Sequence, residues 1–240
     1  MYAKSNYHDT YYEGQSNNAV YMRSASRLKK YLPEDSLVLD YGCGLGWFLM
    51  AVKSLGYGVF GVEFDRDAAQ KAAEHLSSTV LSIEEFWSSQ PLPMFDVIHL
   101  GDVLEHLPEP AQTLKELLKY LKPGGILFLE GPLENNPSLV FWSSSLFGKI
   151  KRLLFARKTA DFPPTHLFRV NAEQQLHFFY RVDESLTLLE WEITETGWPY
   201  NQGGAIKGVI AQIARWLGGR KYGSVTLGNR FHGMFRYQGD

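Results

Sequence analysis

The sequence contains a single cysteine, Cys43, among 240 residues, so no internal disulfide can form. A fold without disulfides fits a reducing compartment. The sequence also lacks any run approaching the roughly 18 apolar residues that a membrane-spanning helix needs. Its first residues, MYAKSNYHDTYYEGQSNN, have no apolar core of the signal-peptide type. These absences predict a cytoplasmic protein, which could still lie against a membrane surface.

An excess of charge of either sign is also missing. Lys and Arg number 24 against 26 Asp and Glu, which gives a formal net charge of −2. A chain so close to neutral offers no general electrostatic attraction to nucleic acid, and we expect no nucleic-acid partner. The length suits one domain with an inserted segment, and the composition leaves the oligomeric state open.

Short runs rich in Val, Ile, Leu and Phe alternate with helical patterns from residue 18 to about residue 131. Five such strands, separated by helices, predict a mainly parallel sheet that is covered on both faces. The fold class is therefore α/β and doubly wound, with ligands expected at the carboxyl ends of the strands. After Pro132 the pattern changes, and we expect two final strands with an amphipathic helix between them.

Three glycines, Gly42, Gly44 and Gly46, stand within five residues directly after the first apolar strand, in LVLDYGCGLGWFL. Glycine has no Cβ, so it permits a tight turn and the close approach of a ligand. The helix that follows offers free N–H groups and the positive end of its dipole. This layout of strand, glycines and helix is typical of a nucleotide-binding turn.

Four details distinguish the possible ligands. The dinucleotide fingerprint needs a third glycine where Trp47 stands, and a phosphate-binding P-loop needs Gly-Lys-Ser/Thr after the glycines. Asp40 precedes the first glycine by two residues and would repel a pyrophosphate but attract an ammonium or a sulfonium. Glu63 ends the second strand and suits hydrogen bonding to ribose hydroxyls. The pattern favours a ligand with a positive charge and a ribose.

Four motifs follow in order: LDYGCGLG, GVEFD, FDVIHLGDVLEHLPEP and LKPGGILFLEGP. They resemble the class I S-adenosylmethionine-dependent methyltransferases, closest in style to the branch that includes the ubiquinone-biosynthesis O-methyltransferases. The resemblance covers residues 35–135 closely and 165–200 loosely. It implies a seven-stranded, Rossmann-like sheet whose last strand is antiparallel. It also implies S-adenosylmethionine as cofactor, S-adenosylhomocysteine as product, and methyl transfer to oxygen or nitrogen of a small, lipid-linked or sugar acceptor.

The resemblance also implies cofactor contacts for these residues at the ends of four successive strands: Asp40, Gly42, Cys43, Gly44, Gly46, Glu63, Phe64, Ser82, Ile83, Gly101 and Asp102. Asp40 and the glycines would hold the methionine part, Glu63 the ribose, and Phe64 one face of the adenine. Ser82 and Ile83 would flank the adenine, and Gly101 and Asp102 would lie beneath the sulfonium. Many relatives have Asp at the position of Ser82, and Glu84 could substitute for it.

Candidate catalytic residues lie in GDVLEHLPEP. Methyl transfer needs a base only if the acceptor must lose a proton. His106 is the candidate base, because the unperturbed pKa of histidine is near 6.5. Alternatively, Glu105 and His106 merely order the turn. Asp102, Glu105 and His106 match an acidic stretch that looks able to hold a metal in quinone O-methyltransferases, but we expect no metal because such loops are common without one.

By the same resemblance, Tyr11 and Tyr12 would fold over the cofactor near the substrate, and His166 would face the substrate. The alternatives are that the tyrosines pack beneath the first helix and that the histidine has a surface or core position. The segment 139–158 is aromatic and basic, a pattern that suits contact with a membrane interface as well as a cap helix with a solvated face.

We interpret the chain as one methyltransferase domain, 1–240, with four parts: an N-terminal helical and aromatic segment at 1–34, a cofactor-binding core at 35–132, an inserted cap at 133–170, and the C-terminal part of the sheet at 171–240. A nicotinamide-dependent oxidoreductase is one alternative, which Trp47 and Asp40 disfavour. A non-catalytic methyltransferase-like protein that binds a ligand or partner is the other, which Asp40 and Glu63 disfavour and Ser82 leaves open.

Overall fold

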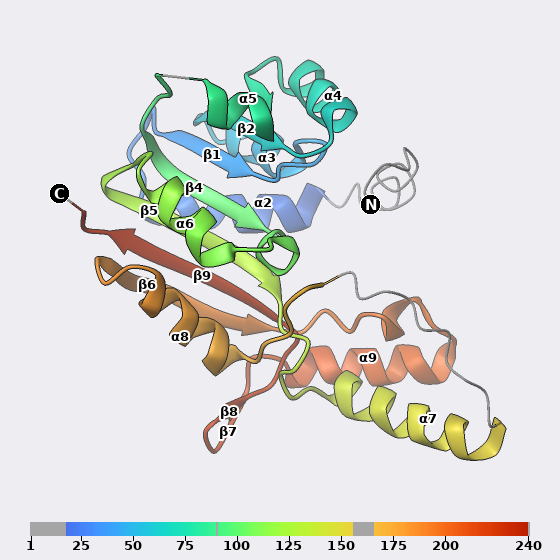
Figure 1. Cartoon of the computed structure of the whole chain (residues 1–240). Helices are drawn as coiled ribbons and strands as arrows, with labels where there is room; N and C mark the ends of the chain where they lie inside the picture. Colours follow the sequence, from blue (N-terminus) through green and yellow to red (C-terminus); the bar gives the residue numbers. More distant parts are fainter. Residues whose placement is uncertain (1–17, 90, 156–165, 240) are drawn as a thin grey trace.

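The computed structural model describes residues 18–89, 91–155 and 166–239, and one seven-stranded sheet forms its centre (Figure 1). The strands of this sheet are β1 (Leu37–Tyr41), β2 (Gly58–Glu63), β3 (Val80–Ser82), β4 (Phe95–Gly101), β5 (Leu121–Pro132), β6 (Leu186–Thr194) and β9 (Arg230–Tyr237). Their order is β3-β2-β1-β4-β5-β9-β6. Strands β1 to β5 pair in parallel, whereas β9 is antiparallel to β5 and β6. The predicted fold class is confirmed.

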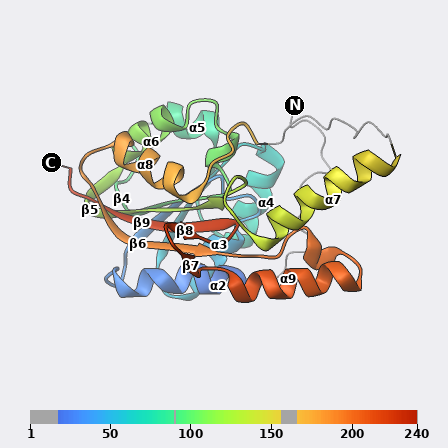
Figure 2. The ribbon, with the colours of Figure 1, turned by 90° about the horizontal axis from the view of Figure 1, so that it is seen from below.

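Helices cover both faces of this sheet (Figure 2). They are α2 (Asn18–Ser26), α3 (Trp47–Ser54), α4 (Arg66–Leu76), α5 (Ile83–Ser88), α6 (Pro110–Leu118) and α8 (Ala172–Val182), with a 3-10 turn, η1 (Arg27–Lys30), after α2. Side chains of α2, α3 and α4 share one buried apolar cluster with the sheet. Side chains of α5, α6 and α8 share the cluster on the opposite face. The apolar faces read from the sequence therefore form two separate cores.

Local capping decides where several of these helices begin. The Asp65 side chain accepts hydrogen bonds from the N–H groups of Asp67 and Ala68 and starts α4. Ser82 and Glu85 form a capping box that starts α5. A helix of six residues such as α5 is too short to show a periodic apolar pattern in the sequence.

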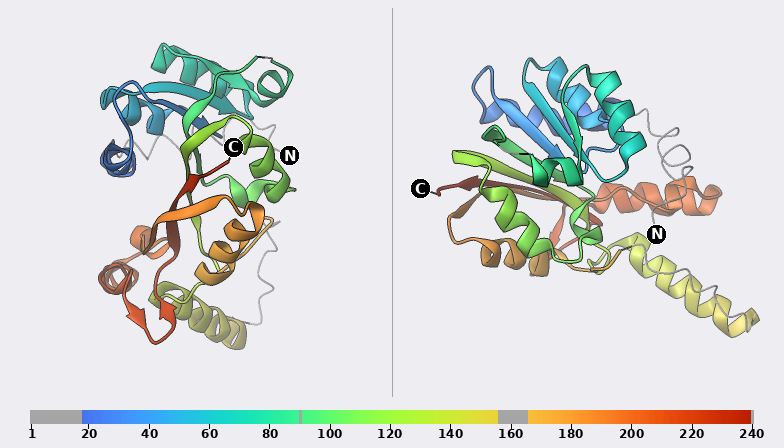
Figure 3. Two further views of the ribbon diagram at one scale, coloured as in Figure 1. Left: turned by 90° about the vertical axis from the view of Figure 1, so that its left-hand side faces the viewer. Right: turned by 45° about the horizontal axis from the view of Figure 1, so that its top comes forward.

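Two further helices, α7 (Leu139–Phe155) and α9 (Ala205–Leu217), pack against each other beyond the end of β6 and the start of β9 (Figures 1 and 3). Val140 of α7 and Ala211 and Ala214 of α9 form a small buried cluster there. A two-stranded hairpin, β7 (Lys221–Tyr222) and β8 (Val225–Thr226), follows α9. Within the predicted cap at 133–170, α7 lies beside α9 and away from β1 and β2, whereas Glu134 and His166 lie beside the turn that follows β4. The role of the segment as a cap stays a prediction.

Among the helices that the structure describes, none has both the length and the apolar character needed to cross a bilayer.

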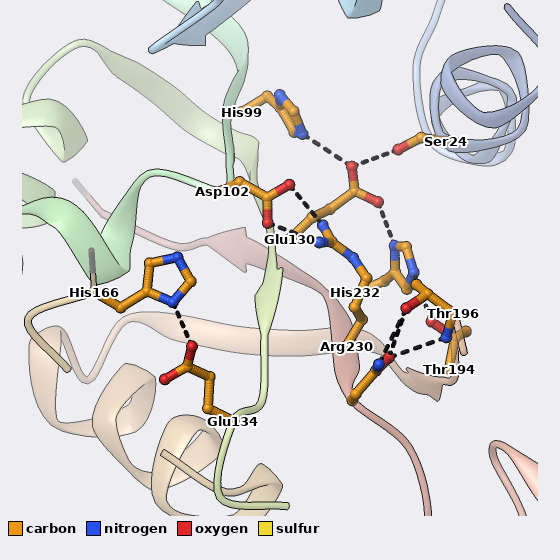
Figure 4. Close-up of polar contacts among 11 residues, drawn as sticks. Ser24, His99, Asp102, Glu130, Glu134, His166, Thr194, Thr196, Arg230 and His232 are labelled. Atoms are coloured by element: carbon orange, nitrogen blue, oxygen red, sulfur yellow. Dashed lines mark hydrogen bonds and ion pairs between the residues drawn. The ribbon is translucent and has the colours of Figure 1, made fainter. Parts of the chain in front are cut away.

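Buried polar side chains form a connected chain through the middle of the sheet (Figure 4). His99 of β4 is bonded through Nδ1 to Asp40 Oδ1 of β1 at 2.7 Å, and through Nε2 to Glu130 Oε2 of β5 at 3.1 Å. Glu130 also accepts a hydrogen bond from Ser24 Oγ of α2 at 2.6 Å and another from His232 of β9. The network therefore connects four strands and one helix.

The partners of His99 require it to carry a positive charge. Both of its ring nitrogens face carboxylate oxygens, which only accept, so both nitrogens must donate. Burial alone would lower the pKa of His99, but the charge and hydrogen bond of Asp40, with those of Glu130, raise it to about 9. Burial would raise the pKa of Glu130, yet hydrogen bonds from His232 and His99 hold it well below its usual range. The charges stabilise one another.

We expect His99→Gln to lower the free energy of unfolding by about 3–5 kcal/mol, because two buried carboxylates lose their cation. The raised pKa of His99 adds a pH dependence. The stabilisation is complete below pH 6.5 and is lost as the pH rises through about 9. Urea unfolding at a series of pH values should therefore show the difference between wild type and variant shrinking across that window.

His177→Gln is the matched control, because His177 is an exposed histidine on α8. It should leave stability and its pH dependence nearly unchanged. A stability difference for His99→Gln that stays constant from pH 6.5 to about 9.5 would contradict a charged imidazole at this position.

Candidate active site

The glycine turn between β1 and α3 is held against the end of β2. The N–H groups of Gly42 and Cys43 donate to the carbonyl oxygen of Val62 at 2.7 and 3.0 Å. The N–H of Gly44 donates to Glu63 Oε2 at 2.7 Å. All three glycines of the motif have positive φ, at 87°, 54° and 82°. The backbone conformation alone therefore requires glycine at these positions.

Side chains of the protein itself approach two of these glycines closely. A Cβ on Gly42 would stand 2.4 Å from Cγ2 of Val103, and one on Gly46 would stand 2.9 Å from Cδ1 of Leu76. The sequence analysis expected a ligand to approach this backbone. At these two glycines the space is taken by the loop after β4 and by the end of α4.

Glu63 ends β2 beside this turn, and its side chain is buried. Its Oε2 accepts from Gly44, and its Oε1 accepts from the N–H groups of Phe64 at 2.8 Å and Asp65 at 3.1 Å. Backbone donors thus fix the carboxylate where hydroxyl donors of a ribose could join or replace them. The next residue, Phe64, leaves 48% of its surface exposed and makes an edge contact with Tyr41.

Two other predicted cofactor residues have structural partners of their own. The carboxylate of Asp40 is buried and bonded to His99, so it places negative charge beneath the glycine turn. Ser82 Oγ accepts the N–H of Glu85 and caps α5. The Glu84 side chain, considered as a substitute, is exposed near Arg66. Contacts of Ser82 and the neighbouring Ile83 with adenine stay predictions.

The chemistry of these groups fits S-adenosylmethionine better than a ligand that carries phosphate. Residues 31–52 contain no Lys or Arg, so no cation within the turn could compensate a phosphate. The carboxylates of Asp40 and Glu63 instead favour a cationic ligand with hydroxyl donors. The exposed ring of Phe64 offers an apolar face for a base. The residues present therefore fit the cofactor that the sequence motifs imply.

The end of β4 is held by an ion pair (Figure 4). Asp102, at a positive φ of 56°, binds Arg230 of β9 through both carboxylate oxygens, at 2.8 and 2.9 Å. The preceding Gly101 has no room for a side chain, because a Cβ would lie 2.8 Å from the His99 ring. Asp102 was predicted to lie beneath the sulfonium, but its charge is compensated by Arg230. Its placement beneath the sulfonium stays a prediction.

A second group of polar side chains lies beside the 3-10 turn η2 (Leu104–His106). Glu105, His106 and His166 each offer one ligand atom, and these atoms all lie within 4.8 Å of one another. The rings of His106 and His166 are in edge contact, and His166 Nδ1 lies 2.7 Å from Glu134 Oε1. Burial, and then the nearby charge of Asp102, raise the pKa of Glu105 to about 8. The group could move a proton or hold a divalent cation.

One of the three residues that the sequence suggested as metal ligands needs correction. Asp102 is turned to Arg230, and the structure brings His166 to Glu105 and His106 in its place. Sixty residues separate His106 from His166, so no spacing pattern could show this. Tyr11 and Tyr12 lie outside the described residues. Sequence reasoning missed His99 and Glu130, although ionisable residues inside the apolar strands FDVIHLG and ILFLEG were a usable signal.

Known proteins resemble this chain in sequence. A family model described as "Methyltransferase domain" matches residues 14–182. A ubiquinone biosynthesis O-methyltransferase of Thiobacillus denitrificans is 33% identical over 98 residues, covering 38% of this chain and 42% of that relative. The chain thus spans about two fifths of the length of the curated relatives it matches.

Solved structures resemble it in fold. A SAM-dependent methyltransferase from Archaeoglobus fulgidus superposes with a TM-score of 0.62 at 19% identity, covering 96% of this chain and 99% of that chain. The magnesium protoporphyrin IX methyltransferase of Synechocystis PCC 6803, solved with bound SAH, gives 0.59 at 14% identity, covering 92% and 83%. Such identities show the shared fold alone. Because the family model spans most of the chain, the chain belongs to the methyltransferase-domain family, and its fold is that of the class I S-adenosylmethionine-dependent methyltransferases.

Proposed function

We propose that this protein transfers the methyl group of S-adenosylmethionine to an oxygen of a small acceptor, either free or linked to a lipid or a sugar. The observation that carries the proposal is the Glu134–His166–His106 group, which follows β4 and β5. Carboxyl ends of parallel strands meet at one edge of a sheet, so this group and the glycine turn lie at the same edge. A hydroxyl acceptor must lose its proton, and histidines at that edge could take it.

The cofactor, when bound, supplies a methyl group already activated for in-line displacement. The protein's own residues then bind and align the two reactants and exclude water. Glu63 would accept hydrogen bonds from the ribose, and Phe64 would cover the adenine. Asp40, held by His99, would supply negative charge near the cationic end.

His106 is our candidate base, and its contact with His166 makes His166 a second candidate. Glu134 accepts a hydrogen bond from His166 Nδ1 at 2.7 Å, so that nitrogen carries the proton. The opposite nitrogen, Nε2, is then the acceptor, which is the tautomer that a base requires. A divalent cation held by Glu105, His106 and His166 is the other use of the same side chains.

Methyl transfer from labelled S-adenosylmethionine to a panel of phenols, quinols and glycans tests the proposal. We expect label on an oxygen of at least one acceptor class. Tight binding of S-adenosylhomocysteine without transfer to any acceptor would contradict the proposal and support the non-catalytic alternative.

Glu63→Ala should weaken S-adenosylhomocysteine binding by about 1–3 kcal/mol, because hydrogen bonds to a charged acceptor are lost. Titration calorimetry measures this directly. Glu74→Ala is the control, since it removes an exposed carboxylate from α4 and should leave the affinity unchanged. If both variants bind like wild type, Glu63 does not hold the ribose.

His106→Ala and His166→Ala should each be assayed in single turnover at saturating cofactor. Loss of the base should reduce the rate about 10²–10⁴-fold while the affinity for S-adenosylhomocysteine holds. The residue whose replacement lowers the rate more is the base. His177→Ala, which changes an exposed histidine on α8, is the control. Unchanged rates in both variants would exclude a histidine base. Activity lost with a chelator and restored by Mg²⁺ would assign the group to a cation instead.

A further inference from the structure

The part of the molecule beyond the sheet carries a net positive charge. We call residues 135–155 and 196–228, which include α7, α9 and the β7–β8 hairpin, the helical lobe. The lobe contains seven Lys and Arg and no Asp or Glu, although acidic residues slightly outnumber basic ones in the whole chain. Positive charge is therefore concentrated in the lobe, and the excess negative charge lies elsewhere.

The α9 helix presents a continuous apolar stripe to solvent. Its four large members are spaced three, four and three residues apart, which places them on one helix face: Ile206, Val209, Ile213 and Trp216. Their exposed fractions are 75%, 54%, 45% and 64%. The stripe is not the packing face of the helix, because Ala211 and Ala214 are the residues buried toward α7. Monomeric proteins seldom leave such a stripe uncovered.

Cations border the aromatic side chains of the lobe. The Arg220 guanidinium lies 3.7 Å above the centre of the Trp216 ring, which still remains largely exposed. Lys207 lies over the ring of Tyr200 at 5.5 Å. On α7, Trp142 and Leu146 are also more than half exposed. A stripe of aliphatic and aromatic groups bordered by Arg and Lys is the composition that suits the boundary between headgroups and acyl chains.

We propose that the helical lobe docks on the surface of a bilayer that contains anionic phospholipids. The α9 stripe would enter the interface, and the Lys and Arg side chains would lie at the headgroup phosphates. Charge decides between this occupant and a second copy of the chain. In a symmetric dimer through this face, two lobes without a single acidic residue would oppose each other, and their like charges would repel.

The inference extends what the sequence indicated, which was membrane contact through 139–158 alone. Helix α9 was predicted as amphipathic, but only the fold shows which of its faces is left uncovered. The inference does not depend on the methyl acceptor or on catalysis. It can be tested with vesicles that contain no acceptor.

The test is flotation of the full chain with vesicles in a density gradient. Vesicles of phosphatidylglycerol and phosphatidylcholine should carry the protein upward, whereas pure phosphatidylcholine should carry roughly tenfold less. Raising the salt from about 0.1 M to 0.5 M should release much of the bound protein, because screening weakens attraction to anionic headgroups.

The informative variant is Ile213→Ser with Trp216→Ser, which changes two exposed side chains and should leave the fold intact. We expect its bound fraction to fall about tenfold or more, with circular dichroism and thermal unfolding unchanged. The matched control is Val20→Ser with Met94→Ser, which removes two exposed apolar side chains outside the lobe. The control should float like wild type.

Several results would overturn the proposal. They are absence of wild-type flotation, equal flotation of the Ile213/Trp216 variant, and equal binding to neutral and anionic vesicles. A wild-type dimer in light scattering that this variant converts to monomer would assign the stripe to a second copy instead. If this variant unfolds at a temperature far below that of wild type, a second variant, Ile206→Ser with Val209→Ser, replaces it. We expect the same loss of flotation for the second variant.

Discussion

The buried imidazolium of His99, held between the carboxylates of Asp40 and Glu130, is the interaction on which the rest of the site depends. It fixes β4 to β1 on one side and to β5 on the other, at the centre of the sheet. Through Asp40 it determines where negative charge lies beneath the glycine turn. Through Glu130 it reaches α2 and the antiparallel strand β9. A charge that could destabilise an apolar core is thereby compensated on both sides.

The cofactor site and the helical lobe differ in charge, and that difference organises the proposed function. Carboxylates of Asp40 and Glu63 dominate the glycine turn, where no basic side chain follows until Lys53. The lobe carries only positive charge. A cationic cofactor and an anionic surface would therefore each find complementary charge at a different part of one molecule. Neither conclusion is visible in the net charge, because acidic residues elsewhere in the chain offset the basic residues of the lobe.

The sequence predicted the features that depend on local patterns. Apolar strands separated by helices indicated the sheet, and the glycine motif with Glu63 indicated the cofactor. Contacts between distant residues had no such pattern. Asp40 and His99 are 59 positions apart in the sequence. His166 lies near Glu105 because its segment returns along the loop after β4, where the Leu167 N–H donates to the Glu105 carbonyl. Ser82 could contact adenine or cap a helix, and in the structure it caps α5.

Titration calorimetry of the whole chain with S-adenosylmethionine and S-adenosylhomocysteine, and in parallel with NADH, shows which ligand binds. The glycine turn, with the carboxylates beside it, should bind the sulfonium cofactor and its thioether product and not a dinucleotide. We expect binding of S-adenosylhomocysteine at micromolar concentration and no binding of NADH. Binding of NADH, or failure to bind S-adenosylhomocysteine by a folded chain, would contradict this expectation.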